Sequence, residues 1–388
     1  MKKEKKEYII FAPINQYGGV NLDVGFLALL ISEEYSVIVI SLGNFYSNSS
    51  VFLFDKNLNY NSLDRIIYNN NFLVKFLTNL ICIIKPIKIP KHFRVENLIT
   101  KSQFINLNKI KLAYIEKEIL KADVIVLCSQ LTSNYMKEIV DIAHSHNKKI
   151  IFRTTGQINK NQLSDENKVW FKKVSVFIHH SKKSQGILKE FMQSGEHKVI
   201  DQNACFEEEF LKIPIRKKNI SRFFTLSRLH ESKGIDTAIS AFLKVSGIED
   251  TLTIYGDGAD EKRLKKIANN SPTIIFNGKV DFKDVPKIFS ENDCLIISSK
   301  FEAGPYSGIE SMAAGTPLIS TRVGAMEERL PNYSYFYDGS EEELERLMKL
   351  MKVLSIEDIQ VISRNLRKIY LNAYTESTIR ELYNVNFE

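Results

Sequence analysis

Two cationic side chains stand five residues apart, directly after a short apolar run. The run is 223–226, and the following segment 227–234 carries Arg228 and Lys233. An arginine guanidinium can hold two phosphate oxygens at once, and a lysine ammonium acts as a compact positive charge. The pattern indicates a phosphate-binding loop, although a solvated loop of the same composition is an equal expectation.

Two carboxylates, Glu302 and Glu310, flank the start of a predicted short helix that ends at Gly315. Carboxylates accept pairs of sugar hydroxyls, so one of them could hold a ribose and the other a hexose. In the alternative, Glu310 only complements the helix dipole and Glu302 is solvated. At the start of this helix, the backbone N–H groups of Tyr306, Ser307 and Gly308 could face a ligand. Pro305 has no N–H group to offer.

Glycines mark two further turns. Gly18 and Gly19 follow the first apolar run and precede a predicted helix, so the backbone could approach a bulky anion there; a plain tight turn is the alternative. Gly256 and Gly258 resemble part of a dinucleotide fingerprint, but Glu261 stands where the third glycine should be. We therefore expect no nicotinamide site.

Short β-branched runs alternate with helix-like segments along the chain, which predicts parallel sheets covered on both faces. Two such series, separated near residue 210, predict two facing, Rossmann-like, doubly wound α/β domains with a ligand cleft between them. We expect an N-terminal domain over 1–208, a C-terminal domain over 209–370, and a final helix, 371–388, that packs back on the first domain. Ser340 and Glu343 predict a capping box at the start of another helix.

The composition narrows the possible partners. The chain has 388 residues and a net charge of +7, with basic residues spread along it, which suits an anionic ligand better than nucleic acid. No uncharged apolar stretch reaches the roughly 18 residues of a membrane span.

The N-terminal lysines and the cysteines bear on where the protein is found. The lysines at 2, 3, 5 and 6 are interrupted by acids and precede no cleavage site, so we expect no export. Four dispersed cysteines predict reduced thiols in a cytoplasmic protein and no metal site.

The segment 70–94 combines an apolar helical face with lysines and one arginine. Such a helix could press on an anionic bilayer from the cytoplasmic side. Packing of the same face against the N-terminal domain is the favoured alternative.

Residues 223–330 resemble the donor-binding half of glycosyltransferase family 4, retaining enzymes of GT-B fold. The resemblance rests on the order Ser-Arg-Leu-x4-Lys-Gly, Gly-Asp-Gly, Phe-Asn-Gly-Lys-Val, Glu-x7-Glu and Met-Ala-Ala-Gly-Thr-Pro, together with the N-terminal Gly-Gly turn. It implies a hexosyltransferase that uses a UDP- or GDP-type sugar as substrate. Its acceptor would be a glycan, lipid-linked or protein hydroxyl, as in polysaccharide biosynthesis. The sequence contains no Asp-x-Asp or other convincing ligand cluster, so we expect no metal or other cofactor, with Arg228 and Lys233 in its place.

The resemblance also implies roles for single residues. Arg228 and Lys233 would neutralise the donor diphosphate, and Glu310 would bind the nucleotide ribose. Glu302 and the backbone around Gly304, Pro305, Tyr306 and Ser307 would hold the transferred sugar and the distal phosphate. Val280 would lie beside the base, while Gly18 and Gly19 would close on the diphosphate from the other domain.

Two departures from the family pattern bear on activity. Family members often carry a histidine near the reacting carbon, where this chain has Thr155 or Gln157, and Tyr306 replaces the usual phenylalanine. His179 and His180 end a strand and could contact the acceptor or simply pack. Two alternatives to transfer remain: a catalytically idle partner subunit that binds nucleotide sugar, and a sugar-nucleotide epimerase.

Overall fold

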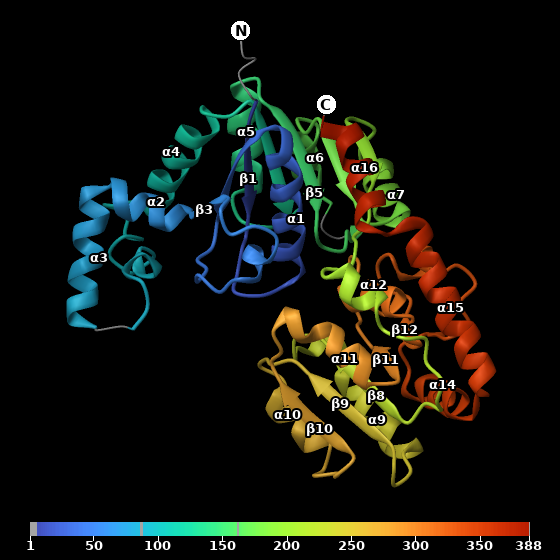
Figure 1. Ribbon diagram of the computed structural model, residues 1–388. Helices are drawn as coiled ribbons and strands as arrows, with labels where there is room; N and C mark the ends of the chain where they lie inside the picture. The colour runs from blue at the N-terminus through green and yellow to red at the C-terminus, as the bar shows by residue number, and fades with distance from the viewer. Residues whose placement is uncertain (1–5, 86–87, 161–162, 388) are drawn as a thin grey trace. The chain divides into compact units, whose positions relative to one another are not determined.

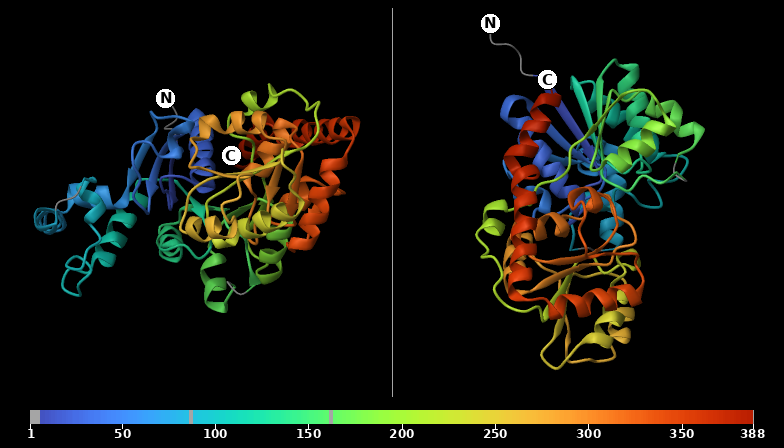
Figure 2. Two further views of the ribbon diagram at one scale, coloured as in Figure 1. Left: turned by 90° about the horizontal axis from the view of Figure 1, so that it is seen from below. Right: turned by 90° about the vertical axis from the view of Figure 1, so that its right-hand side faces the viewer.

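The computed structural model describes residues 6–85, 88–160 and 163–387. The chain divides into two compact units (Figures 1 and 2), the first ending at residue 199 and the second beginning at residue 200, with residues 180–184 grouped with the second. The boundary predicted after residue 208 falls a few residues beyond this division. The lysines at 2, 3 and 5 lie outside the described residues. The packing of residues 371–388 on the first domain stays a prediction.

The first unit is built on a seven-stranded sheet in the order β3-β2-β1-β4-β5-β6-β7, with all paired strands parallel. Its central strand β4 is buried at every position because helices cover both faces of the sheet. The strands are β1 Glu7–Ala12, β2 Ser36–Ser41, β3 Asn59–Ser62, β4 Val124–Ser129, β5 Lys149–Thr154, β6 Val176–His179 and β7 Glu196–Val199.

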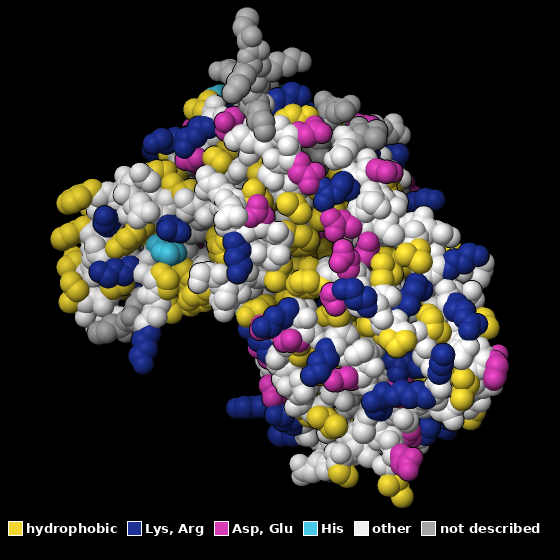
Figure 3. Space-filling model, in the orientation of Figure 1, with side chains coloured by type: hydrophobic (Ala, Val, Ile, Leu, Met, Phe, Trp, Pro, Cys, Tyr) yellow, Lys and Arg dark blue, Asp and Glu magenta, His cyan; other side chains and the backbone are white. Residues whose placement is uncertain are grey.

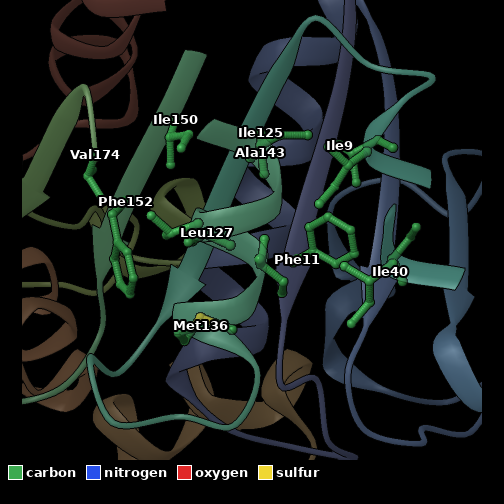
Figure 4. Close-up of a cluster of buried hydrophobic side chains, with 14 of the residues drawn as sticks. Ile9, Phe11, Ile40, Ile125, Leu127, Met136, Ala143, Ile150, Phe152 and Val174 are labelled. Atoms are coloured by element: carbon green, nitrogen blue, oxygen red, sulfur yellow. The ribbon is translucent and has the colours of Figure 1, made fainter. Parts of the chain in front are cut away.

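Helices and short 3-10 turns connect these strands. They are α1 Gly19–Glu34, η1 Ser50–Leu53, α2 Leu63–Asn70, α3 Phe72–Ile84, η2 Lys91–Arg94, α4 Leu107–Ile119, α5 Met136–Ser145, α6 Asp165–Phe171 and α7 Lys182–Phe191. The core of the unit forms where strand side chains such as Phe11, Leu127 and Phe152 meet helix side chains such as Met136 (Figure 4).

The second unit carries a six-stranded parallel sheet in the order β10-β9-β8-β11-β12-β13. Its strands are β8 Arg222–Leu226, β9 Thr251–Tyr255, β10 Ile274–Gly278, β11 Cys294–Ile297, β12 Leu318–Thr321 and β13 Phe336–Tyr337. Its helices are α8 Glu207–Leu211, η4 Glu231–Lys233, α9 Ile235–Val245, α10 Glu261–Ile267, η5 Phe282–Asp284, α11 Val285–Glu291, α12 Tyr306–Ala314, α13 Met326–Arg329, α14 Glu341–Val353, α15 Ile356–Ala373 and α16 Glu376–Phe387.

The predicted fold class, two doubly wound parallel α/β domains, is confirmed by these sheets. The predicted capping box forms only in part. The Ser340 hydroxyl accepts a hydrogen bond from the Glu343 N–H and starts α14, but the Ser340 N–H donates to Asp338 and the Glu343 carboxylate accepts from Arg346. Two strands differ from what the sequence pattern indicates. The asparagine-rich β3 has no apolar run, and β7 ends at Val199, although the run 198–203 favours a strand over its whole length.

Helix α3 departs from its favoured prediction. Only Val74 and Thr78 of this helix are buried. Six apolar side chains are exposed, so the prediction that the apolar face packs against the N-terminal domain is wrong for them; they are Phe72, Leu73, Phe76, Leu80, Ile83 and Ile84. Figures 1 and 2 show α3 and the coil after it standing away from the sheet of the first unit.

Among the described residues, no single helix has the length and apolar character needed to cross a bilayer. Helices α2 and α3 together pass that test by length and composition, but they meet at a bend of 103°.

Candidate functional site

The strand order of each sheet reverses at one point. The reversal lies between β1 and β4 in the first unit and between β8 and β11 in the second. Loops that leave two such neighbouring strands diverge to opposite faces and open a crevice at the carboxyl edge of the sheet. The Gly18–Gly19 turn follows β1, the Arg228 and Lys233 segment follows β8, and Glu302 follows β11, so these sequence-predicted residues lie at the reversal points.

The loop after β8 is held in place by the Gly-Asp-Gly turn. The Leu229 N–H donates to the Asp257 carbonyl at 2.7 Å, and the Asp260 N–H donates to the Leu229 carbonyl at 3.1 Å. A Cβ atom at Gly258 would lie 2.2 Å from the Leu229 carbonyl oxygen. The turn that resembles a nucleotide fingerprint therefore supports the Arg228 loop through close backbone contact.

The same loop is tied to the loop after β11. Gly234 has φ +59°, and a Cβ atom there would lie 2.2 Å from the Ser298 carbonyl oxygen, so only glycine fits without displacement. The Ser298 hydroxyl donates to the Lys233 carbonyl at 2.9 Å, and the Lys300 N–H donates to the Ser232 carbonyl at 2.8 Å. These contacts fix the backbone of Lys233 against the segment that leads to Glu302.

Lys233 and Glu302 form an ion pair, although 69 residues separate them in the sequence. Their side chains are 15% and 19% exposed, so a ligand could still reach both. The Ser299 hydroxyl also donates to the Glu302 carboxylate, at 3.0 Å. Arg228 is exposed, and among the described residues its guanidinium has no ion-pair partner. The ammonium is therefore neutralised internally, whereas the guanidinium remains available to an anion.

A buried arginine supports the loop between β11 and α12. The Arg329 guanidinium forms two hydrogen bonds with Asp201, at 2.8 and 2.7 Å, and donates to the Pro305 carbonyl at 2.8 Å. A Cβ atom at Gly304 would lie 2.7 Å from this guanidinium, which explains the glycine. Sequence reasoning missed Arg329 and Asp201. Gly304 and Pro305 indicated the loop after β11, but nothing in their pattern indicated which residues hold that loop in place.

Glu310 lies in the first turns of α12 and is buried. In the described part of the chain its carboxyl has neither a hydrogen-bond partner nor an ion-pair partner, and burial raises its pKa to about 8. At neutral pH the carboxyl is therefore largely protonated. A group that offers hydrogen bonds or positive charge at this position would favour its ionised form.

The remaining predicted residues of the second unit lie at the start of α12 and just beyond β10. The Gly308 N–H donates to the Pro305 carbonyl at 3.2 Å, so it is used by the first turn of α12. Gly308 also packs closely: a Cβ atom there would lie 2.5 Å from the Met326 sulfur. Tyr306 and Ser307 are half-buried at the start of the helix. Val280 is half-buried just beyond β10 and packs on the hydrophobic core.

In the first unit, Gly18 caps α1 with φ +142° and ψ +161°, a conformation that favours glycine. A Cβ atom at Gly18 would meet nothing within 4 Å, so the turn is open. Gly19 is the exposed first residue of the helix. A buried pair, Arg153 with Asp23 at 3.8 Å, links α1 to the end of β5.

Thr155 and Gln157 follow β5. The Thr155 hydroxyl and the Gln157 side-chain carbonyl are buried, and neither has a hydrogen-bond partner in the part of the chain that the structure describes. Their unsatisfied oxygens could take a ligand hydroxyl. His179 and His180 are buried. His179 stacks on His197 with ring centroids 5.4 Å apart, so packing, and not acceptor contact, is the role that the structure supports for His179.

A cavity of about 790 Å3 lies in the first unit, between the loop after β4 and the start of α4. Its lining is mainly polar and includes Glu96, Lys101, Asn108 and Ser133. Two non-glycine residues of the lining have left-handed backbone: Asn106 with φ 46° and Tyr135 with φ 68°. The Tyr135 hydroxyl donates to the Asn108 side-chain oxygen at 2.9 Å. Sequence reasoning did not predict this cavity, because its walls come from four separate segments, which are Leu42, 96–108, 131–138 and 167–170.

No group of three or more His, Cys, Asp or Glu side chains among the described residues could hold a metal ion. The four cysteines are unpaired, and Cys128, Cys205 and Cys294 are buried. The predicted independence of metal stays a prediction.

Residues 206–365 match the family model described as "Glycosyl transferases group 1". An uncharacterized 41.2 kDa protein in the cps region of Klebsiella pneumoniae is 28% identical over 135 residues, 34% of this chain and 35% of that protein. Mannosylfructose-phosphate synthase of Agrobacterium fabrum is 30% identical over 114 residues, 26% of this chain and 25% of that protein. The matched region thus spans about a third or less of each of these relatives.

Among solved structures, Anabaena Alr3699/HepE in complex with UDP and glucose superposes with a TM-score of 0.70 at 15% identity and covers 98% of this chain and 99% of its own. Trehalose-6-phosphate synthase OtsA superposes with a TM-score of 0.69 at 12% identity, with 98% of each chain covered. These likenesses extend over both units, and the fold is the expected GT-B type.

Proposed function

We propose that this protein transfers a sugar from a nucleoside diphosphate sugar to a hydroxyl acceptor, with retention of configuration and without a metal. The observation that carries the proposal is the Lys233–Glu302 pair, which joins the two loops that leave the reversal point of the second sheet, with exposed Arg228 on the same loop as Lys233. This region lies within the segment that matches the glycosyl transferase model. The bound UDP and glucose of the structural neighbour make UDP-glucose the first donor to test.

The roles follow from charge and burial. Arg228 and Lys233 would stabilise the charge that builds on the leaving diphosphate, because cations fixed before the reaction lower the barrier without reorganising. When the diphosphate binds, the Lys233 ammonium would contact a phosphate oxygen as well as the Glu302 carboxylate, so its ion pair with Glu302 would weaken. Glu302 would then also be free to hold hydroxyls of the transferred sugar, together with the backbone of residues 304–307.

Glu310 would accept hydrogen bonds from the ribose hydroxyls, and the backbone near Val280 would lie beside the base. Because Glu310 is largely protonated before the ligand binds, we propose that nucleotide binding lowers its pKa and releases a proton. Gly18 and Gly19 would offer the open N-terminus of α1 to the diphosphate.

The proposed chemical step breaks the bond between the anomeric carbon and the β-phosphate oxygen. The acceptor oxygen bonds to the same face of that carbon, and its proton passes to the departing phosphate oxygen. The unsatisfied oxygens of Thr155 and Gln157 would bind hydroxyls during this step. Glycosyltransferase family 4 is the family that this mechanism and motif order favour.

Donor turnover tests the proposal. We expect UDP-sugar or GDP-sugar hydrolysis or transfer by the full chain, with a loss of about 100-fold to 1000-fold in kcat for Lys233→Ala. Lys287→Ala, at an exposed position of α11, should change turnover little. Thermal unfolding of each variant checks that the fold persists. Nucleotide binding with no turnover for any donor or acceptor would instead identify the idle partner subunit, and turnover to an isomeric nucleotide sugar would identify an epimerase.

The cavity of the first unit is the proposed acceptor site, because its hydroxyl, amide and charged side chains suit a polyhydroxylated ligand. Thr132 is exposed and lines this cavity, so Thr132→Trp should fill part of it. We expect the acceptor KM to rise about tenfold, with donor hydrolysis unchanged. Ser145→Trp at the other end of α5 is the matched control. An unchanged acceptor KM in Thr132→Trp would place the acceptor elsewhere.

A further inference from the structure

Helix α3 presents an apolar face that the first unit does not cover. Phe72 is 84% exposed, Ile83 is 74% exposed and Ile84 is 71% exposed. With about 100° between successive residues, the six exposed apolar residues fall on one arc of about 120°. The covered side of the helix, Val74 and Thr78, lies outside this arc. The exposed face is therefore a continuous stripe, not a scatter of single side chains.

The coil after α3 extends this surface. Leu98 is 92% exposed and Phe104 is 100% exposed. The same coil lines the cavity of the first unit through Glu96, Lys101 and Asn106. The apolar surface, defined as the exposed face of α3 with Leu98, Ile99 and Phe104, is thus continuous in sequence with one wall of the proposed acceptor site.

Basic side chains accompany the apolar surface. Residues 72–104 contain six Lys or Arg residues and one acid, so they carry five of the seven net positive charges of the chain. The single acid, Glu96, is paired with Lys101 and Lys111. The remaining lysines of the segment are exposed and have no ion-pair partner among the described residues; they are Lys75, Lys85, Lys88 and Lys91. Figure 3 shows hydrophobic and basic side chains gathered over the α3 part of the molecule.

We infer that this surface docks on an anionic lipid bilayer and lies in its interface. Apolar side chains would enter the boundary between headgroups and acyl chains, while lysines would contact anionic headgroups. Helix α3 has 13 residues and is about 20 Å long, shorter than the hydrocarbon core, so it would lie along the bilayer and not cross it. A second copy of the chain fits less well, because it would bring the same positive charges face to face.

The inference deepens the proposed function, on which its acceptor part rests. Docking through the coil that also lines the cavity would present that cavity to molecules in the headgroup layer. The acceptor class would then be a hydroxyl group carried by a membrane lipid.

Vesicle sedimentation with the full chain tests the docking step. Vesicles of phosphatidylcholine alone are compared with vesicles of phosphatidylcholine and phosphatidylglycerol in equal parts. We expect about tenfold stronger binding to the anionic vesicles, and about a tenfold loss for the triple variant Phe72→Ser, Phe76→Ser and Ile83→Ser. The matched control replaces three exposed apolar residues of the second unit: Ile248→Ser, Val353→Ser and Val361→Ser. This control should bind like the unchanged protein.

Three outcomes would overturn the inference: no binding to anionic vesicles, equal binding by the α3 variant, or a concentration-dependent oligomer that the α3 variant abolishes. UDP affinity is measured on every variant in solution and should be unchanged. Normal UDP affinity and donor turnover without vesicle binding would reject the docking surface alone, whereas vesicle binding without UDP affinity or turnover would reject the proposed function alone.

Discussion

A single buried carboxyl, Glu310, gives the second unit a pH-sensitive stability. Burial raises its pKa to about 8 from an ordinary value of 4.5. The unfolded chain therefore releases this proton near pH 4.5, while the folded chain keeps it until about pH 8. Between these values the folded state binds more protons, so the contribution of Glu310 makes stability fall as pH rises.

Replacing the carboxyl by an amide should remove this slope. We expect Glu310→Gln to lose less stability than the unchanged protein between pH 5 and pH 8, by an amount on the order of 1 kcal/mol or more. Urea denaturation at several pH values measures the difference. Glu291→Gln, at an exposed position on α11, should follow the unchanged protein. Parallel pH profiles for Glu310→Gln and the unchanged protein would contradict the assignment.

Arg329 should be costly to remove, because its loss takes two charge-assisted hydrogen bonds from the largely buried carboxylate of Asp201. We expect Arg329→Met to destabilise the protein by about 3–5 kcal/mol, measured by urea denaturation. The double variant Asp201→Asn with Arg329→Met should be more stable than the sum of the two single effects predicts. Additive losses would show that the pair does not act as a unit.

The residues of the candidate site differ in how far the sequence could reveal them. Lys233 and Glu302 each follow a strand end, and neighbouring parallel strands bring such positions to one edge, so their proximity could be predicted. Arg329 could not be found this way. Its partner Asp201 is 128 residues distant, and the contact depends on how a connecting segment packs under the loop.

At the scale of elements, the backbone conformation at Gly234 joins two loops. Gly234→Ala should cost more than about 1 kcal/mol, because the added Cβ atom would meet the Ser298 carbonyl oxygen and the left-handed φ disfavours a side chain. Gly186→Ala is the control: it lies inside α7 with nothing within 4 Å, so it should stabilise the protein by about 0.5–1 kcal/mol. Thermal and urea unfolding compare the two variants. Equal effects would mean that the loop contact is dispensable.

Element predictions succeeded where burial dominates the sequence pattern. Strands such as β4 are apolar at nearly every position, because both faces of the sheet are covered. The edge strand β3 reads Asn-Tyr-Asn-Ser and lacks this pattern, so its pairing with β2 was not predictable from composition. The helical period of α3 was predictable, but its exposure was not, because a periodic apolar face does not reveal what covers it.

At the scale of the molecule, each unit has its own core and its own reversal point, so ligand effects should be local. With UDP at 100 times its dissociation constant, we expect amide exchange to slow by up to about 100-fold in the loops after β8 and β11. The start of α1 should also slow if Gly18 and Gly19 contact the diphosphate, whereas α3 should be unaffected. Hydrogen-exchange mass spectrometry of the full chain measures this pattern. Protection confined to α3 would contradict the donor site.

The unequal burial of the four cysteines offers a built-in reporter. Burial raises the pKa of Cys128 well above its usual range and raises the pKa of Cys205 to about 12, and Cys294 is equally enclosed. Cys82 is the half-buried exception, and it lies on α3. A maleimide fluorophore should therefore label the native chain mainly at that helix, and its emission would report the polarity around α3 without any engineered thiol.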